Sequence, residues 1–230
     1  MSKDSILKSI WSFFYTKDES AMDALTEEQY LEIFIKGRSK EEIEKSYNKA
    51  WEARNFEIEL YWKRANYFWA FQIASFAGYF TVLNSKAYSD NPQVLYFVIC
   101  IGFVTSLAWA FTNIGSKMWQ RHWEIHVDML ENSITGPLYK IMTSVKTFSL
   151  TKINEIVSKF IVTIWAILIF KYFCEHVTFI YSKGCEVDYQ VWISSIAVIY
   201  FVGAMVNGHG RGRFGHRRVK FYKRKFSTEN

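Results

Sequence analysis

Histidine and cysteine are the side chains whose types and spacing in this sequence could support chemistry. His122 and His126 lie four residues apart, so a helix would place both imidazoles on one face, as many metal sites do. The order His-Trp-Glu-Ile-His nevertheless differs from the zinc-protease pattern, Glu124 points off the shared face, and the sequence offers no evident third ligand. We therefore favour an amphipathic helix, with Trp119 and Trp123 as neighbours, over a metal site.

Two cysteines, Cys174 and Cys185, fall in one short loop that we expect outside the cytoplasm. A disulfide bond between them would close a loop of about ten residues and contribute roughly 2 to 3 kcal/mol, and two free thiols are the alternative. His176 is close to Cys174 in sequence, but no oxyanion motif accompanies the pair. Because phosphate-binding loops and hydrolase or kinase signatures are also absent from the sequence, we expect no catalytic residue, no metal and no cofactor.

Long apolar stretches must position these side chains. Apolar residues make up 50% of the 230-residue chain and aromatic residues 19%, with only 2 prolines, which excludes disordered and Pro-rich classes. Four stretches are long enough to approach a bilayer core of roughly 30 Å. They run from Ala65 to Leu83, Val94 to Ile114, Ile156 to Phe173 and Tyr189 to Val206. The sequence therefore predicts an all-α, polytopic membrane protein with four transmembrane helices in two hairpins and long cytoplasmic helical extensions.

Basic residues predict the orientation. All but Lys86, Lys171 and Lys183 of the 28 Lys and Arg residues lie on one side of the predicted spans. Because Lys and Arg are retained in the cytoplasm, both termini are predicted to be cytoplasmic.

The predicted segments follow from these spans and from helix signals between them. Ser39-Lys40-Glu41-Glu42 is a capping box, and no Gly or Pro follows it until Gly78, so one helix could run from Lys40 to Leu83. A second capping box at Thr26 opens a short helix that stops at Gly37. The chain is therefore predicted to consist of six segments, divided at the limits of the two hairpins. In order, they are amphipathic and short cytoplasmic helices (1–38), a stalk continuous with the first span (39–64), the first hairpin (65–114), a helical connector (115–155), the second hairpin (156–206) and a basic tail (207–230). Apolar residues between Ile6 and Tyr15 would bind the membrane surface, a partner or the protein's own cytoplasmic helices.

The C-terminal tail carries the net positive charge of the chain. Its eight basic residues are predicted to bind anionic lipid headgroups, because they directly follow a span: Arg211, Arg213, Arg217, Arg218, Lys220, Lys223, Arg224 and Lys225. Nucleic acid is a less favoured partner, and a third interpretation pairs the tail with the acid-rich segment Glu41 to Glu59 of a neighbouring subunit. The sequence names no small-molecule substrate.

Small residues in the first span predict close helix packing. Ala70, Ala74 and Gly78 lie four residues apart, a seam that lets another helix approach, within the subunit or from a second copy. Next to the membrane, we expect subunit contacts at Glu57, Glu59, Lys63 and Arg64.

The runs ARNFEIELYWKRANYFWAF, GSKMWQRHWEIHVDMLEN and ITGPLYK resemble the RipA-type octameric membrane proteins of bacteria. The resemblance covers both hairpins in outline. It implies a homo-oligomer of the bacterial inner membrane, with eight subunits, linked to growth inside host cells and modulation of host responses. It carries over no catalytic motif.

These features favour a non-enzymatic membrane scaffold or interaction platform that assembles with itself. The main rival is an oligomeric pore or membrane-perturbing effector lined by polar span residues, namely Gln72, Thr105, Ser106, Asn113, Ser194 and Ser195. A lipid-modifying enzyme is a third class, which would need a catalytic role for His122 or His126.

Overall fold

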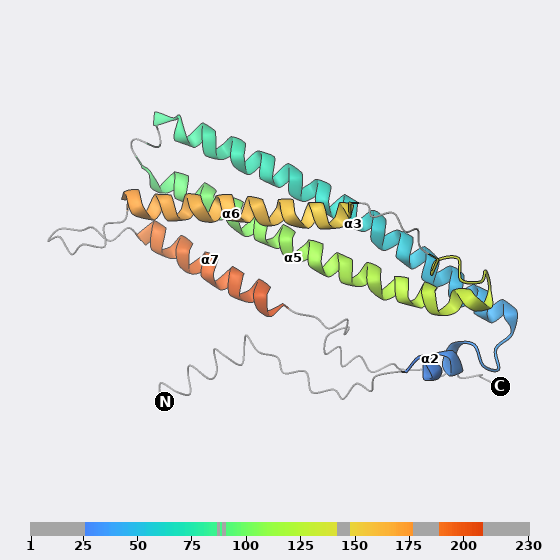
Figure 1. The fold of residues 1–230 in the computed structure, drawn as a ribbon. Helices are drawn as coiled ribbons and strands as arrows, with labels where there is room; N and C mark the ends of the chain where they lie inside the picture. Colours follow the sequence, from blue (N-terminus) through green and yellow to red (C-terminus); the bar gives the residue numbers. More distant parts are fainter. Residues whose placement is uncertain (1–25, 87, 89–90, 142–147, 177–188, 209–230) are drawn as a thin grey trace, which may run out of the picture.

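The computed structural model describes residues 26–86, 88, 91–141, 148–176 and 189–208, and within them it is helical, with no strand (Figure 1). In chain order the elements are α2 (Glu27–Phe34), α3 (Lys40–Leu83), α5 (Gln93–Leu130), the short 3₁₀ helix η1 (Glu131–Ser133), α6 (Leu150–His176) and α7 (Tyr189–Asn207). The predicted all-α class is confirmed, and α3 begins and ends at the residues expected from the sequence.

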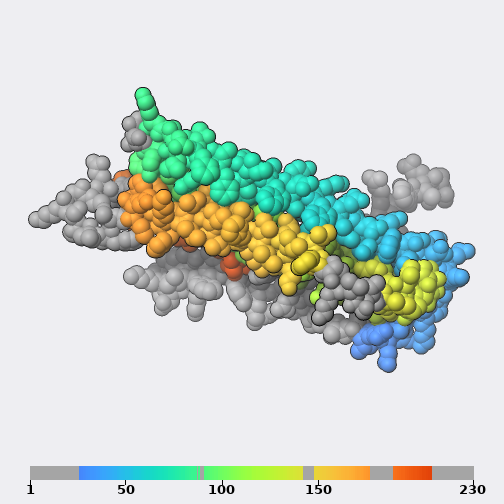
Figure 2. All heavy atoms as spheres, turned by 45° about the horizontal axis from the view of Figure 1, so that its top comes forward, coloured from blue at the N-terminus to red at the C-terminus, as the bar shows by residue number. Residues whose placement is uncertain are grey.

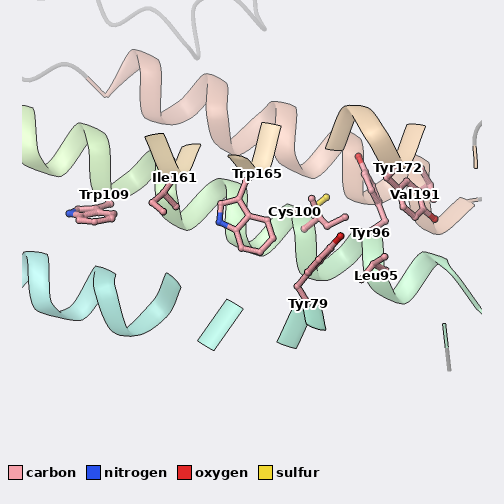
Figure 3. Close-up of a cluster of buried hydrophobic side chains, with 10 residues drawn as sticks. Tyr79, Leu95, Tyr96, Cys100, Trp109, Ile161, Trp165, Tyr172 and Val191 are labelled. Atoms are coloured by element: carbon pink, nitrogen blue, oxygen red, sulfur yellow. The ribbon is translucent and has the colours of Figure 1, made fainter. Parts of the chain in front are cut away.

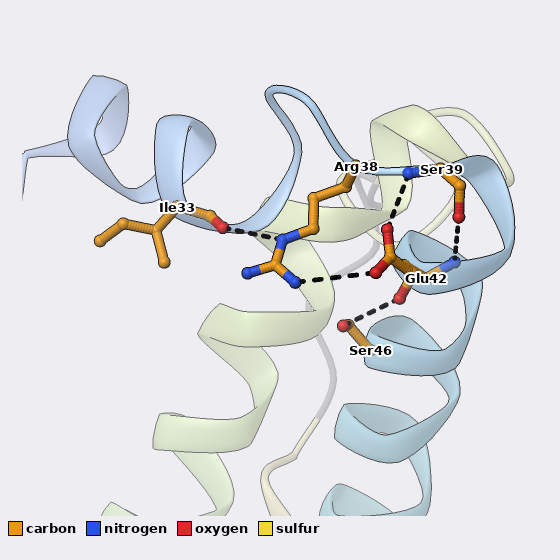
Figure 4. Close-up of polar contacts among 5 residues, drawn as sticks. All are labelled: Ile33, Arg38, Ser39, Glu42 and Ser46. Atoms are coloured by element: carbon orange, nitrogen blue, oxygen red, sulfur yellow. Dashed lines mark hydrogen bonds and ion pairs between the residues drawn. The ribbon is translucent and has the colours of Figure 1, made fainter.

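The predicted capping box opens α3, the longest helix (Figure 4). The Ser39 hydroxyl accepts a hydrogen bond from the backbone N–H of Glu42 at 3.3 Å, and the Glu42 carboxylate accepts one from the backbone N–H of Ser39 at 2.9 Å. Gly37 has a φ of 75°, a left-handed conformation that glycine adopts readily after a helix. From this start α3 continues for 44 residues, about 65 Å, so the stalk and the first apolar stretch form one helix.

The central helix is α5, which contacts α2, α3, α6 and α7. Its buried side chains meet those of its neighbours in one apolar cluster (Figure 3), which includes Tyr79 from α3, Trp165 from α6 and Val191 from α7. Trp109 and Trp165 are fully enclosed in this cluster. The core of the protein is therefore the contact surface of α5.

Three helical segments are long and apolar enough to cross a membrane within the described chain: Gln93–Ser133, Leu150–His176 and Tyr189–Asn207. The first has 41 residues, about twice what a bilayer core needs, and its apolar half is the predicted span that ends near Ile114. The helix α3 is not among the three. Asn66, Gln72 and several Tyr and Trp residues lower the mean hydropathy of its apolar half, so the count of four spans and the two-hairpin topology stay predictions.

Candidate functional site

The contact between α3, α5 and α6 contains hydrogen-bonded side chains within apolar surroundings. Gln72 on α3 joins the three helices: its amide nitrogen donates to Thr105 Oγ1 on α5 at 2.9 Å, and its carbonyl oxygen accepts from Trp165 Nε1 on α6 at 2.7 Å. The Gln72 side chain is 1% exposed. Because apolar surroundings make an unpaired amide or indole N–H costly, these two bonds fix the relative position of the helices.

A second polar group ties the start of α6 to the other two helices. Asn154 Nδ2 donates to Tyr61 OH on α3 at 2.8 Å and to Asn113 Oδ1 on α5 at 3.2 Å. The Asn113 amide also donates to Ser158 Oγ at 3.2 Å, and Tyr61 OH donates to the carbonyl of Thr151 at 3.2 Å. The three helices are thus joined again about three helical turns from Gln72, at the predicted boundary of the spans.

A charged pair continues this contact toward the stalk. Arg64 Nη1 donates to Ser116 Oγ on α5 at 2.8 Å and lies 3.7 Å from Glu57 Oε2 on its own helix. Gln120 on α5 donates to the backbone carbonyl of Glu57 at 3.4 Å. Of the four subunit-contact candidates, Glu57 and Arg64 therefore face α5 within the subunit.

The other two candidates lie on the outer surface of α3. Glu59 and Lys63 are largely exposed, and Lys63 Nζ lies 3.7 Å from Glu59 Oε2. Ala70 and Ala74 are exposed on the same side of α3, and Gly78 is half-buried, with Val98 of α5 at 3.6 Å from where a Cβ would stand. The space-filling view shows α3 and α6 side by side along one face of the molecule (Figure 2). The seam is thus mostly unused within one subunit.

The close approach that the sequence analysis missed occurs at Gly102 on α5. A Cβ added there would lie 2.3 Å from Trp165 Cε2, so only glycine leaves room for the indole ring. Gly102, Ser106 and Ala110 lie four residues apart on α5 and are all buried, so small residues repeat here as they do in the α3 seam. This spacing was therefore a signal in the sequence that could have found the contact.

A buried carboxylate, also missed, holds the loop after α5. Glu131 is 0% exposed, and its two carboxylate oxygens accept the backbone N–H groups of Tyr139 at 2.6 Å and Lys140 at 3.1 Å. The Tyr139 ring in turn lies edge-on to Trp51 of α3, and the Arg54 guanidinium stands about 5 Å from both ring centres. The only signal in the sequence was the Gly136-Pro137 break, which predicts a turn but not its partner.

The histidine pair lies beside α2 rather than in a metal-like cluster. Tyr30 OH is 2.6 Å from His126 Nδ1, and the ring of Phe34 lies edge-on to the same imidazole. The rings of His122 and His126 have centroids 4.8 Å apart. Burial, and secondarily the charge of His122, lowers the pKa of His126, while burial raises the pKa of Tyr30 to about 12. One nitrogen of His126 is thus engaged by tyrosine, and in the described residues no three His, Cys, Asp or Glu side chains gather as a metal would need.

The remaining candidates lie partly outside the described residues. Cys174 is exposed near the end of α6, and Cys185 is not described, so the disulfide stays a prediction. All eight basic residues of the predicted lipid-binding tail also lie outside the described residues, as does the amphipathic segment between Ile6 and Tyr15.

Long apolar helices with polar side chains paired between them define a helical integral membrane protein. The model of the octameric membrane protein family (8xMP) matches residues 44–174, more than half of the chain, and the chain belongs to this family. The match covers α5, almost all of α3 and all but the end of α6. No curated protein and no solved structure matches the chain.

Proposed function

We propose that the chain is a non-enzymatic subunit of a homo-oligomer, with eight copies, that serves in the membrane as a scaffold or interaction platform. Membership of a family described as octameric supports self-association. The observation that carries the proposal is the outer face of α3, where Ala70 and Ala74 are exposed while Gln72 points inward. Small side chains on an exposed span face allow a helix of the next copy to approach closely.

The proposal includes α3 as a fourth span. Gln72 is bonded to Thr105 in the apolar half of α5, and Tyr79 belongs to the same buried cluster as Ile99 and Cys100. If that half of α5 lies in lipid, residues 65–83 lie beside it at the same depth. The distribution of Lys and Arg supports cytoplasmic termini. The bacterial inner membrane is proposed on the resemblance to RipA-type proteins.

A pore is the second candidate, and the side-chain contacts disfavour it. Of the six polar residues that could line a path, five are engaged within the subunit. Gln72 bonds to Thr105, Asn113 bonds to Ser158, Ser106 donates to the carbonyl of Phe103, and Ser195 donates to the carbonyl of Val191. Ser194 is half-buried. These groups give one subunit its structure and leave few polar side chains to face water.

A role in host cells rests on the resemblance to RipA-type proteins alone. We propose it as the setting in which the platform acts, through growth inside host cells and modulation of host responses. Deletion of the gene, followed by complementation with assembly-competent and assembly-deficient variants, would test whether the role depends on the oligomer.

The mass of the complex in lipid nanodiscs tests assembly directly. We expect one closed species of about eight 27.2 kDa chains. Ala74→Trp should break this species into smaller ones, because the bulky ring would block the α3 seam. Ala166→Trp, at an exposed alanine on α6, is the matched control and should leave the mass unchanged. A monomeric or dimeric wild type would refute the platform, and equal effects of the two variants would refute the α3 seam as the contact.

A further inference from the structure

Lysine side chains gather at the beginning of α6, where this helix enters its apolar stretch. Lys152 and Lys159 are exposed and lie seven residues apart, which places them on nearly the same side of the helix. Glu155 lies between them, and Lys159 Nζ is 2.6 Å from Glu155 Oε1. The Glu155 side chain is only 22% exposed, so its carboxylate is a partly sheltered centre for the two amines.

A third lysine comes from α5. Asn113 and Asn154 are hydrogen-bonded to each other, which sets the two helices at the same level. Lys117 follows Asn113 by one helical turn, is exposed, and lies within electrostatic range of the Glu155 carboxylate together with Lys152 and Lys159. Lys159 forms the ion pair with this carboxylate, and Lys117 and Lys152 add two more positive charges near it. The cluster therefore keeps a surplus of positive charge.

The opposite end of α6 lacks this surplus. There Lys171 has its own acidic partner, Glu175, at 3.8 Å, so the pair is neutral. Near the lysine cluster, in contrast, Ile156 and Phe160 are exposed on the side of α6 next to the lysines. One end of the helix thus combines a net positive charge with an apolar surface that continues into the membrane.

We propose that Lys117, Lys152 and Lys159 bind the phosphate group of an anionic phospholipid, whose acyl chains lie along Ile156 and Phe160. Basic groups beside a span attract anionic headgroups, and the attraction increases with each added charge. Glu155 neutralises one of the three positive charges, through its ion pair with Lys159, and leaves the charge of the other two. This site is separate from the basic C-terminal tail, and it does not depend on the number of subunits.

Binding of single lipids to the full-length protein tests the site. Native mass spectrometry from detergent would follow titrations with phosphatidylglycerol and, in parallel, with phosphatidylcholine. We expect the variant Lys117→Gln/Lys152→Gln/Lys159→Gln to bind phosphatidylglycerol at least tenfold more weakly, with phosphatidylcholine binding unchanged. Lys171→Gln, at the other end of α6, is the matched control and should bind as the wild type does. The tail is the same in all these proteins and contributes a common background.

A charge-preserving variant separates loss of the site from loss of the fold. Lys117→Arg/Lys152→Arg/Lys159→Arg should retain phosphatidylglycerol binding within about threefold, because arginine also binds phosphate. Unchanged lipid binding by the glutamine variant, equal weakening by Lys171→Gln, or failure of the arginine variant would each overturn the proposal. Inorganic phosphate at millimolar concentration would be added as a competitor. If it abolished phosphatidylglycerol binding, the ligand of the site would be free phosphate, and the proposal of a lipid ligand would be wrong.

Discussion

The contact between α3, α5 and α6 has more hydrogen-bonded and buried side chains than the contacts that attach α7 and α2. The three-helix body is joined by hydrogen bonds at Gln72 and at Asn154 and by the enclosed Trp109 and Trp165. In α7, Val191 alone among the described residues is buried, and a side-chain hydrogen bond between Ser195 and Tyr96, at 2.7 Å, joins this helix to α5. The helix α2 is attached mainly through Tyr30.

This difference indicates a rigid body with two more loosely held elements. Burial and paired polar groups give the body most of its stability, whereas exposed elements open at lower free energy. Subunit assembly would therefore be expected to use the body, and α7 and α2 can adjust to neighbours. Four changes, from the largest expected effect to the smallest, test this division.

Gly102→Ala should have the largest effect. The added Cβ would overlap the Trp165 ring, and forcing the ring out of a packed core should cost about 1 to 3 kcal/mol. Gly115→Ala on the same helix meets nothing within 4 Å and should stabilise the protein by about 0.5 to 1 kcal/mol. Thermal unfolding in detergent compares the two. Destabilisation of similar size at both positions would show that α5 and α6 do not approach closely at Gly102.

Gln72→Leu should have the next largest effect. The change leaves the buried Trp165 N–H without its acceptor, at a cost of about 1 to 2 kcal/mol. The double variant Gln72→Leu/Trp165→Phe removes both partners and should be less destabilised than the sum of the single changes. Denaturant unfolding of the four proteins measures the coupling. Simple additivity would mean that this hydrogen bond does not hold the body together.

Ser195→Ala tests the attachment of α7. Loss of the contact with Tyr96 should cost about 0.6 kcal/mol or less, as is typical of interhelical hydrogen bonds in membranes. Hydrogen exchange should increase in α7 and stay unchanged in α3. Ser194→Ala, at the neighbouring serine, is the control. An equal increase throughout the protein would place α7 within the rigid body.

Acidification should loosen α2 with little effect on the other helices. Because burial lowers the pKa of His126 below its usual 6.5, the undocked state takes up a proton more readily than the docked state. Docking is therefore fully stable above pH 6.5 and weakens as the pH falls toward the lowered pKa. Limited proteolysis between pH 8 and 5 would detect the release of α2. His126→Gln should remove this dependence, and a variant that kept it would assign the effect to another group.

The limits of the elements were well predicted, because they depend on neighbours in sequence. The capping boxes at Thr26 and Ser39 each join residues three positions apart, and both form as expected. The apolar stretches predicted the ends of α7 to within one residue and the ends of α6 to within six residues. The contacts within the subunit were not predicted: Arg64 donates to Ser116, and Gln120 donates to the backbone carbonyl of Glu57. The subunit contacts expected at Glu57 and Arg64 stay predictions.

The sequence by itself determined that this chain forms long apolar helices, where they start and stop, and which family it resembles. Local hydrogen bonds and the length of apolar runs decide these properties, and both can be read along the chain. Only the tertiary structure decided which polar groups pair. Gln72 and Trp165 are 93 residues apart in the sequence. Glu131 accepts hydrogen bonds from backbone N–H groups, and no pattern of side chains reveals such a partner. Their partners depend on how α3 and α6 pack against α5, and that packing depends on the shapes of many side chains at once.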